Sequence, residues 1–204
     1  MKIYHVVTGL LRVNTYVLVN DNDEALVIDC GERIKSIIEA KNKYGFNIKA
    51  VLLTHAHFDH SGCVKALQDQ GAKVYISKLD APKLLNDDNL SVDFGRKFDY
   101  CTADFTFDDG DELEILGFKL KVIATPGHTD GSVCFLMDRM LFTGDTLFLQ
   151  SVGRTDFKSG DRNALVNSVK KLFALDGDYN VYPGHEDFTT LEHERKYNTF
   201  IDYD

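Results

Sequence analysis

The sequence predicts an α/β fold that forms a single domain over residues 1–204. Short runs rich in β-branched and aromatic residues alternate with segments of helical periodicity, so the strands cannot all be joined by hairpins. Helices are therefore expected to cover the sheets. No Pro- and Ser-rich linker or low-complexity tract divides the 204 residues, a length that one large domain can accommodate.

The predicted strands are short and rich in Val, Ile, Leu, Phe and Tyr. Four of them end directly before a cluster that contains histidine or aspartate. In chain order the strands are Ile3–Val7, Tyr16–Val19, Ala25–Ile28, Ala50–Leu53, Lys73–Ile76, Phe118–Ala124, Val133–Met137, Met140–Phe142 and Asn180–Tyr182.

Three segments carry apolar residues at the i, i+3, i+4 spacing of an amphipathic helix. Glu32–Tyr44 ends at Gly45, and Ser61–Gln70 ends before another glycine. Asp161–Leu175 begins with an aspartate that can cap the first turn. The polar, irregular stretch Asp87–Phe105 is predicted to be a loop that reaches over a site.

The charge balance excludes one class of partner. The chain has 23 basic and 32 acidic residues, a net charge of −9, and only short basic clusters. Because clustered Lys and Arg bind a phosphate backbone, we expect a small-molecule substrate and no nucleic acid. No apolar run approaches the roughly 18 residues of a membrane span, and no secretory signal is apparent, so a cytoplasmic protein is expected. The oligomeric state is left open.

The four cysteines, Cys30, Cys63, Cys101 and Cys134, form no CxxC motif and no close pair. We expect them to be small buried hydrophobic residues in a reducing compartment and not a disulfide framework. Cys63 is accordingly assigned to core packing and not to a redox switch.

Five of the seven histidines fall in three clusters, and each cluster follows a predicted strand. The first is His55-Ala56-His57-Phe58-Asp59-His60, and the other two are Pro-Gly-His tripeptides that end at His128 and His185. A further strand runs into Thr143-Gly144-Asp145. Because ligands of α/β sheets collect beyond the carboxyl ends of strands, we expect these side chains to share one site.

The spacing points to metal binding. In an extended segment residues i and i+2 point the same way, so His55 and His57 can converge on one cation, beside a second served by Asp59 and His60. The glycines before His128 and His185 permit tight or left-handed turns that aim these rings. A lone histidine after a strand is usually a surface or core residue, but the four strand ends together favour a metal site. Imidazole with carboxylate suits Zn²⁺, Fe²⁺ or Mn²⁺, and the absence of cysteine argues against a closed structural zinc site.

In order and separation, these residues resemble the signature of the metallo-β-lactamase superfamily. The resemblance implies a four-layer αββα sandwich with the site at one edge of the two sheets. It also implies two divalent metals, expected to be zinc, with iron or manganese as alternatives. It assigns His55, His57 and His128 to the first metal, Asp59, His60 and His185 to the second, and Asp145 to a bridging position.

Further stretches resemble the short bacterial form of the glyoxalase II-like hydrolases, namely Asn14-Thr15-Tyr16, Gly153-Arg154-Thr155-Asp156 and Tyr182-Pro183-Gly184-His185. This resemblance implies a dinuclear hydrolase in which a metal-bound hydroxide attacks a thioester such as a hydroxyacylglutathione, with Asp59 and Asp145 as catalytic residues. True β-lactamases of this fold lack the bridging carboxylate, which disfavours lactam hydrolysis. The C-terminal helical domain that supplies glutathione contacts in full-length members is not expected here, so recognition of glutathione is left open.

Three residues are expected to support the ligands without binding metal: Asp29, Thr54 and Arg154. Asp29 matches the acidic residue of the family's first motif, which supports the metal loop. Arg154 with Asp156 is interpreted as a buried pair that braces the site, with a substrate contact or a simple turn as alternatives.

Other polar side chains are given weaker assignments. His193 is interpreted as solvated on a charged helical face, and His5 is assigned no role. Tyr4, Tyr16 and Tyr100 are candidates to lend a hydroxyl to a pocket, and nothing in the sequence chooses among them.

Three other functions remain open. Persulfide dioxygenases share the fold, and their sequences are similar to the stretch Gly153–Phe157. This resemblance implies a single iron, held by the equivalents of His55, His128 and Asp145. Their last histidine motif usually reads Pro-Ala-His, whereas this chain has Pro183-Gly184-His185, which favours a hydrolase. A nuclease has the right metal ligands but the wrong surface charge, and an intact ligand set argues against a non-enzymatic scaffold.

Overall fold

A computed structural model describes residues 1–200, so the last four residues of the predicted domain lie outside the described part. The first of two large sheets has the strand order β1-β2-β3-β4-β5-β6. β1, β2 and β3 are antiparallel neighbours, whereas β3 to β6 run parallel. Their bounds are β1 Lys2–Thr8, β2 Val13–Val19, β3 Glu24–Ile28, β4 Asn47–Leu52, β5 Lys73–Ser77 and β6 Phe105–Phe107.

The second sheet has the order β14-β13-β10-β9-β8-β7, with one parallel pair between β10 and β13. A small hairpin of β11 (Leu147–Phe148) and β12 (Ser151–Val152) follows β10. The remaining bounds are β7 Glu112–Ile115, β8 Phe118–Ala124, β9 Val133–Met137, β10 Met140–Gly144, β13 Asn180–Pro183 and β14 Thr189–Thr190.

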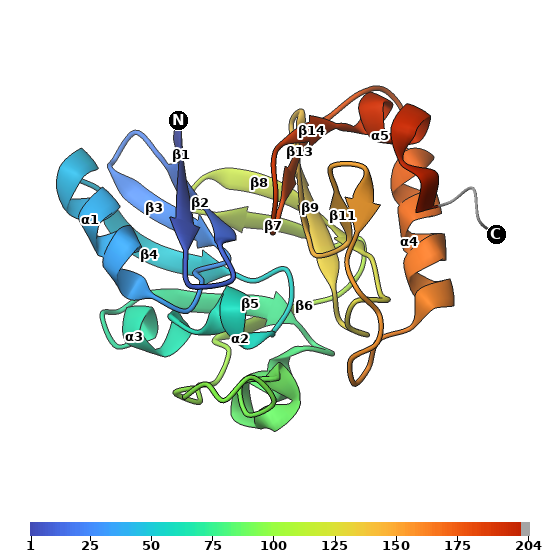
Figure 1. Cartoon of the computed structure of the whole chain (residues 1–204). Coiled ribbons are helices and arrows are strands. Elements are labelled where there is room, and N and C mark those ends of the chain that lie inside the picture. The colour runs from blue at the N-terminus through green and yellow to red at the C-terminus, as the bar shows by residue number, and fades with distance from the viewer. Residues whose placement is uncertain (201–204) are drawn as a thin grey trace.

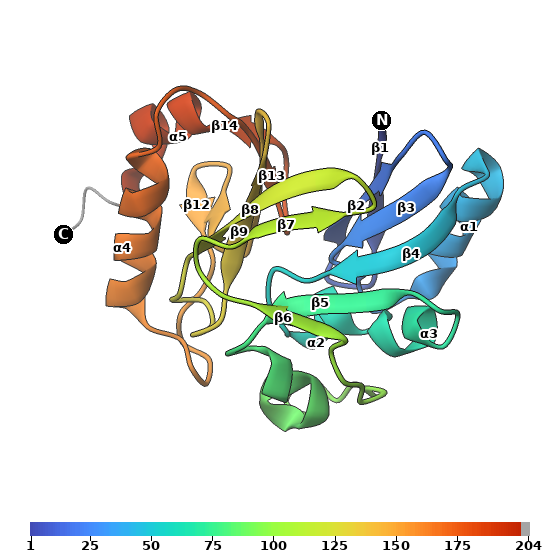
Figure 2. The same ribbon diagram turned by 180° about the vertical axis from the view of Figure 1, so that it is seen from behind.

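Helices cover the outer face of each sheet. Helices α1 and α3 lie against the first sheet and helices α4 and α5 against the second, as opposite views show (Figures 1 and 2). This is the predicted four-layer α/β arrangement. The helices are α1 Ile34–Tyr44, α2 Phe58–Ser61, α3 Val64–Gln68, α4 Arg162–Phe173 and α5 Leu191–Tyr197, and the short 3₁₀ turns are η1 Ala81–Leu85 and η2 Asp87–Asn89.

Helices begin and end as predicted where a capping residue next to the helix determines the boundary. α1 ends at Gly45 in a left-handed conformation with φ 76°. Asp161 caps α4, and its side chain accepts a hydrogen bond from the Ala164 amide. The predicted helix over 61–70 is found in part: α3 covers Val64–Gln68, and a separate single turn, α2, precedes it. The break falls where the Cys63 amide donates to the carbonyl of Gly31 at 2.8 Å instead of continuing α2.

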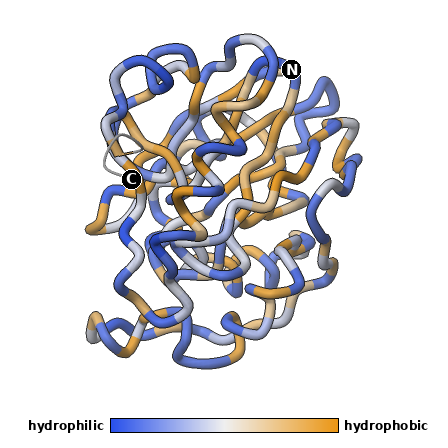
Figure 3. Tube along the Cα trace, turned by 90° about the vertical axis from the view of Figure 1, so that its right-hand side faces the viewer, coloured by the Kyte–Doolittle hydropathy of each residue, from blue (hydrophilic) through white to orange (hydrophobic). Residues whose placement is uncertain are grey.

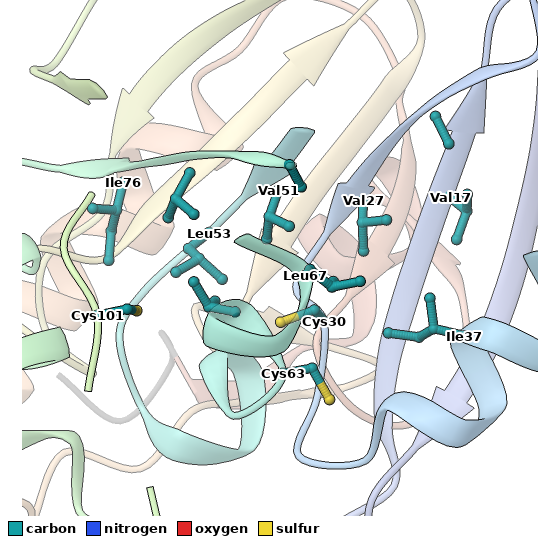
Figure 4. Packing of buried hydrophobic residues seen from close by; sticks show 14 of the residues in the cluster. Val17, Val27, Cys30, Ile37, Val51, Leu53, Cys63, Leu67, Ile76 and Cys101 are labelled. Carbon is teal, nitrogen blue, oxygen red and sulfur yellow. The ribbon is translucent and has the colours of Figure 1, made fainter. Parts of the chain in front are cut away.

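Three apolar layers hold the structure together. One lies between the sheets and includes Leu26, Leu52 and Phe135. A second lies between the first sheet and its helices, where Val27 and Val51 face α1 and α3 (Figure 4). A third lies beneath α4 and α5. Strands between two layers are buried on both faces, which explains their continuous apolar runs, visible as orange segments in the interior (Figure 3).

The cysteines are buried hydrophobic residues, as predicted. Three of them, including Cys63, belong to the layer beneath α1 and α3, and Cys134 belongs to the layer beneath α4 and α5. Across residues 1–200, no helix has both the length and the apolar character needed to cross a membrane.

Candidate metal centre

The loops after β4, β8, β10 and β13 bring all seven predicted ligands to one edge of the two sheets. Their nitrogen and oxygen atoms form overlapping groups in which the candidate ligand atoms lie within 4.8 Å of one another. These groups are His55 with His57 and His128, His55 with His60 and Asp145, and Asp59 with His60 and His185.

The first group consists of three buried histidines. Nδ1 of His57 lies 2.8 Å from Nε2 of His128. The His55 ring is held from behind, because its Nδ1 lies 3.1 Å from the hydroxyl of Thr54. Nδ1 of His128 donates to the carbonyl oxygen of Arg154 at 2.7 Å. The bonds to Thr54 and Arg154 fix the orientation of the His55 and His128 rings and leave Nε2 of each ring free to face the centre.

The second group is organised in the same way. Nδ1 of His60 lies 2.9 Å from Oδ2 of Asp29, and Nδ1 of His185 donates to the Leu11 carbonyl at 3.0 Å. The Nε2 atoms of these two rings therefore face each other at 3.3 Å. Asp59 joins them, with Oδ2 3.3 Å from Nε2 of His185.

Asp145 lies between the two groups. Its Oδ1 is 3.2 Å from Nε2 of His60, and its Oδ2 is 3.5 Å from Nε2 of His128 and 3.6 Å from Nε2 of His185. One carboxylate thus reaches both groups, which is the arrangement that a bridging ligand requires.

The loop glycines work in different ways. Gly127 has φ +139°, a conformation that other residues rarely adopt, so its predicted special turn is found. Gly184 does not have a positive φ, and the left-handed alternative is wrong there. Its lack of a side chain permits a close approach instead: a Cβ at this position would lie 2.4 Å from Oδ1 of Asp145 and 2.6 Å from Cε1 of His60.

The two groups differ in their protonation. Burial and the neighbouring histidines lower the pKa of His55, and they lower the pKa of His57 to about 3. Burial also opposes the charge on His60 and His185, but nearby carboxylates, Asp145 first, outweigh it and raise the pKa of both rings. In the metal-free protein, the neutral form is therefore favoured for His55 and His57, and the charged form for His60 and His185.

The donor set fits divalent metal ions. The Nε2 atoms of His55 and His57 are buried and make no hydrogen bond within residues 1–200. Buried polar atoms normally have partners, so atoms left without one at a focus of imidazole and carboxylate groups suit a cation. All the groups are nitrogen or oxygen donors, in keeping with Zn²⁺, Fe²⁺ or Mn²⁺.

A cavity of about 800 Å³ opens over this centre. On the side of His57 it is aromatic: the ring centroids of Phe58 and Phe94 are 5.3 Å apart, and those of Phe94 and Phe157 are 5.9 Å apart. On the side of His185 the lining combines Leu11 and Phe148 with four polar residues, Arg12, Asn14, Glu186 and Asp187. Leu90 and Phe94 belong to the irregular 87–105 segment, so this segment borders the cavity, as the sequence suggested.

Two predictions about surrounding residues need correction. Arg154 does pair with Asp156, with contacts of 2.6 and 2.7 Å, but the pair is exposed and not buried. Two charged side chains that pair in solvent keep most of their hydration, so burial is not needed to form the pair. Arg154 supports His128 through its backbone carbonyl, an interaction that residue type cannot reveal. His193 is half-buried beside Gln150 and not fully solvated.

The tyrosines lend no hydroxyl to the cavity, since none of the three candidates lines it. Tyr16 is buried, and its hydroxyl donates to the carbonyl of Pro183. His5, which was given no role, lines the cavity, and its Nε2 lies 2.8 Å from Oδ1 of Asn14. His5 precedes no cluster and ends no strand, so the sequence carried no signal for it.

One buried carboxylate at the site was missed. Asp80 follows β5 and bonds to the loops that carry His55, His57 and His128. It lies beyond the carboxyl end of a strand, as the predicted ligands do, and that position was the available signal.

The family follows from comparison with known proteins. The family model described as the Metallo-beta-lactamase superfamily matches residues 8–185. A probable metallo-hydrolase of Streptococcus pyogenes is 36% identical over 98% of this chain and 90% of its own length. The hydroxyacylglutathione hydrolase GloC of Haemophilus influenzae is 31% identical over 98% of each chain. The chain belongs to the metallo-β-lactamase superfamily, which supports a metal-dependent hydrolase.

Solved structures share the whole fold. BLEG-1, described as a B3 metallo-β-lactamase, superimposes with a TM-score of 0.92 at 35% identity, covering 98% of this chain and 99% of that one. TTHA1623 in a di-iron-bound form gives 0.87 at 32% identity, covering 97% and 99%. ETHE1 from Myxococcus xanthus gives 0.82 at 28% identity, covering 97% and 83%.

Proposed function

We propose that this chain is a dinuclear metal-dependent hydrolase of thioesters, with hydroxyacyl thioesters of glutathione as the candidate substrates. The position of Asp145 carries the proposal, because its carboxylate lies within 3.2–3.6 Å of histidine nitrogens from both ligand groups. Similarity to a hydroxyacylglutathione hydrolase over nearly the full chain supports the same assignment.

The residues would hold two cations in the two groups described, with Asp145 between them. Divalent cations held there supply an acidified water molecule and a polarised carbonyl oxygen. The carboxyls of Asp59 and Asp145 have lowered pKa values, since the charge on His60 outweighs the effect of burial, so both are ionised at the cavity floor. They orient the centre and offer acceptors for the proton of an attacking water.

The cavity lining favours a good leaving group. Within the described chain, no Lys, Tyr or Cys lines the cavity, and the one lining histidine outside the predicted ligands, His5, has its Nε2 2.8 Å from Oδ1 of Asn14, so few side chains there can protonate an amine or alkoxide leaving group. A thiol has a pKa near 8.5, so a thiolate can depart with little protonation. Thioester hydrolysis therefore demands less of this site than amide or ester hydrolysis does.

The two sides of the cavity suggest how a thioester lies. Apolar groups fit against Phe58, Phe94 and Phe157 on the side of His57. On the opposite side, Arg12 lines the cavity, and its guanidinium pairs with no carboxylate among residues 1–200. It is therefore placed to bind an anionic group of the substrate, such as a carboxylate on the thiol half.

Metal analysis combined with a substrate panel tests the proposal. We expect about two metal ions per chain and hydrolysis of S-lactoylglutathione. The panel should include a simple acyl thioester and a chromogenic β-lactam, because one similar structure is described as a B3 metallo-β-lactamase. Hydrolysis of the lactam without any thioester would overturn the proposal, and hydrolysis of the simple thioester alone would remove glutathione while keeping the chemistry.

An iron-dependent persulfide dioxygenase is the second candidate. The resemblance of Gly153–Phe157 to the corresponding stretch of these enzymes favours it. Against it, His185, Asp59 and His60 form a complete second group, which a single-iron site does not need. One iron per chain and oxygen uptake with a persulfide would establish this alternative.

A further inference from the structure

Asp80 is a buried carboxylate outside both ligand groups. It follows β5 and precedes η1, with 0% of its surface exposed. Its Oδ2 accepts a hydrogen bond from the Ala56 amide at 2.8 Å. That amide lies between His55 and His57, so the bond fixes the peptide segment that joins two predicted ligands of the first metal.

The same carboxylate also reaches the loop of the third histidine. The hydroxyl of Thr129, the residue after His128, lies 3.1 Å from Oδ1 and 3.0 Å from Oδ2 of Asp80. The loop closes tightly around the carboxylate, since a Cβ on Gly131 would lie 2.4 Å from Oδ1. Asp80 is thus bonded on both sides of the three-histidine group.

The ammonium group of Lys83 balances the negative charge of Asp80. It contacts the carboxylates of Asp80 and Asp130, and the Lys83 side chain is 8% exposed. Burial alone would lower the pKa of Lys83, but the two carboxylates raise it, so the lysine stays charged. Replacing a buried ion pair by apolar residues is often neutral or stabilising, so the pair is weak evidence for a role in stability. A hydrophobic pair could not supply acceptors to Ala56 and Thr129.

We infer that Asp80, charge-balanced by Lys83, is a positioning residue that sets the geometry of His55, His57 and His128 for the first metal. The inference rests on the metal site of the proposed function. It assigns Asp80 no contact with substrate or metal: its effect passes through the Ala56 amide and the Thr129 hydroxyl.

Substitutions at Asp80 and Thr129 test this inference. Each variant is purified with zinc, stripped of metal with a chelator and titrated with zinc again. Asp80→Asn and Thr129→Val should each weaken zinc binding at one of the two sites about tenfold or more, as loss of a ligand-supporting hydrogen bond usually does. The absorption bands of the Co²⁺-substituted protein should shift, because the histidine geometry changes. Thr129→Ser keeps the hydroxyl and should restore both the zinc affinity and the cobalt spectrum.

Asp104→Asn is the matched control. Asp104 likewise accepts from a backbone amide, that of Val74, and pairs with a lysine, Lys73, but these partners lie at the start of β5, whereas Asp80 follows its end. This variant should lower the melting temperature and leave zinc affinity unchanged. If Asp80→Asn does not fold, the zinc affinities and cobalt spectra of Thr129→Val and Thr129→Ser are compared instead, and a difference between them supports the positioning role.

Two outcomes overturn the inference, and they are distinguishable. A wild-type protein that binds metal normally, with unchanged zinc affinity and cobalt spectrum in Asp80→Asn and Thr129→Val, overturns the positioning role alone. A wild-type protein that binds no metal overturns the proposed function together with the inference.

Discussion

Oδ2 of Asp29 lies 2.9 Å from Nδ1 of His60 and also accepts the hydroxyl of Thr54 at 2.7 Å. That hydroxyl lies 3.1 Å from Nδ1 of His55. One buried carboxylate is therefore linked directly to the second ligand group and through Thr54 to the first. Oδ1 accepts the Thr54 amide at 2.8 Å, so both oxygens of Asp29 are used.

Asp29→Asn should weaken binding at both metals. The amide nitrogen replaces an acceptor with a donor, facing either the His60 ring or Thr54. We expect zinc affinity to fall about 10–100-fold and the unfolding free energy of the metal-free protein to fall by about 1–3 kcal/mol. Chelator competition and urea denaturation measure the two effects. The exposed carboxylate control, Asp156→Asn, should change neither, and wild-type zinc affinity in Asp29→Asn would refute the linkage.

Gly184→Ala should damage the metal centre by steric conflict. The new methyl would lie 2.4 Å from Oδ1 of Asp145 and 2.6 Å from the His60 ring, so at least one ligand must move. We expect zinc occupancy of the second group to fall about tenfold or more. Gly110→Ala is the control: its φ of +83° makes alanine unfavourable there, but no atom lies within 4 Å. It should cost about 1 kcal/mol of stability and leave the metal content intact. Equal metal content in both variants would contradict the steric argument.

Much of the fold was predictable because buried strands appear in the sequence as continuous apolar runs, and because helix-capping residues lie next to the helices they cap. β8 and β9 have the predicted bounds, and the cap at Asp161 forms as expected. The missed strands are short: β6, β7 and β14 lie at sheet edges, and β11 and β12 form the separate small hairpin, so few apolar residues are needed in them. The break after α2 depends on a hydrogen bond to Gly31, which is distant in sequence.

The ligand groups were predictable for a similar reason. Histidines and aspartates at strand ends must converge once the sheets form, so sequence position carries spatial information. A residue that acts through its backbone cannot be recognised in this way. Arg154 supports His128 with its carbonyl oxygen, a group that every residue has. Gly184 was singled out for turn geometry, whereas its role depends on the approach of Asp145 from another strand.

Arg12→Gln should raise KM selectively for anionic thioesters. The guanidinium lines the cavity without a carboxylate partner among residues 1–200, so it is available for a substrate carboxylate. We expect KM for S-lactoylglutathione to rise about tenfold, equivalent to about 1.4 kcal/mol, with kcat nearly unchanged. KM for an uncharged thioester should stay the same. Arg33→Gln, which removes an exposed arginine outside the cavity, is the control, and an equal effect on both substrates would exclude a charge contact.

Metal binding should release protons from His60 and His185 of the second group, whereas His55 and His57 of the first group have none to release. The raised pKa values of His60 and His185 mean that these rings carry protons in the metal-free protein near neutral pH. The lowered pKa values of His55 and His57 mean that these rings are already neutral. A metal must displace the protons of His60 and His185, so affinity for the second metal falls as the pH is lowered, while protons compete less for the nitrogens of His55 and His57.

Lowering the pH from about 8 to about 6 should therefore remove one metal ion before the other. Titration calorimetry of the metal-free protein in buffers of different ionisation enthalpy counts the protons released at each step. His193→Gln removes a histidine outside both groups and should leave the proton count unchanged. Simultaneous loss of both metals, or binding of the second metal without proton release, would show that the carboxylates around His60 do not keep its ring charged in the metal-free protein.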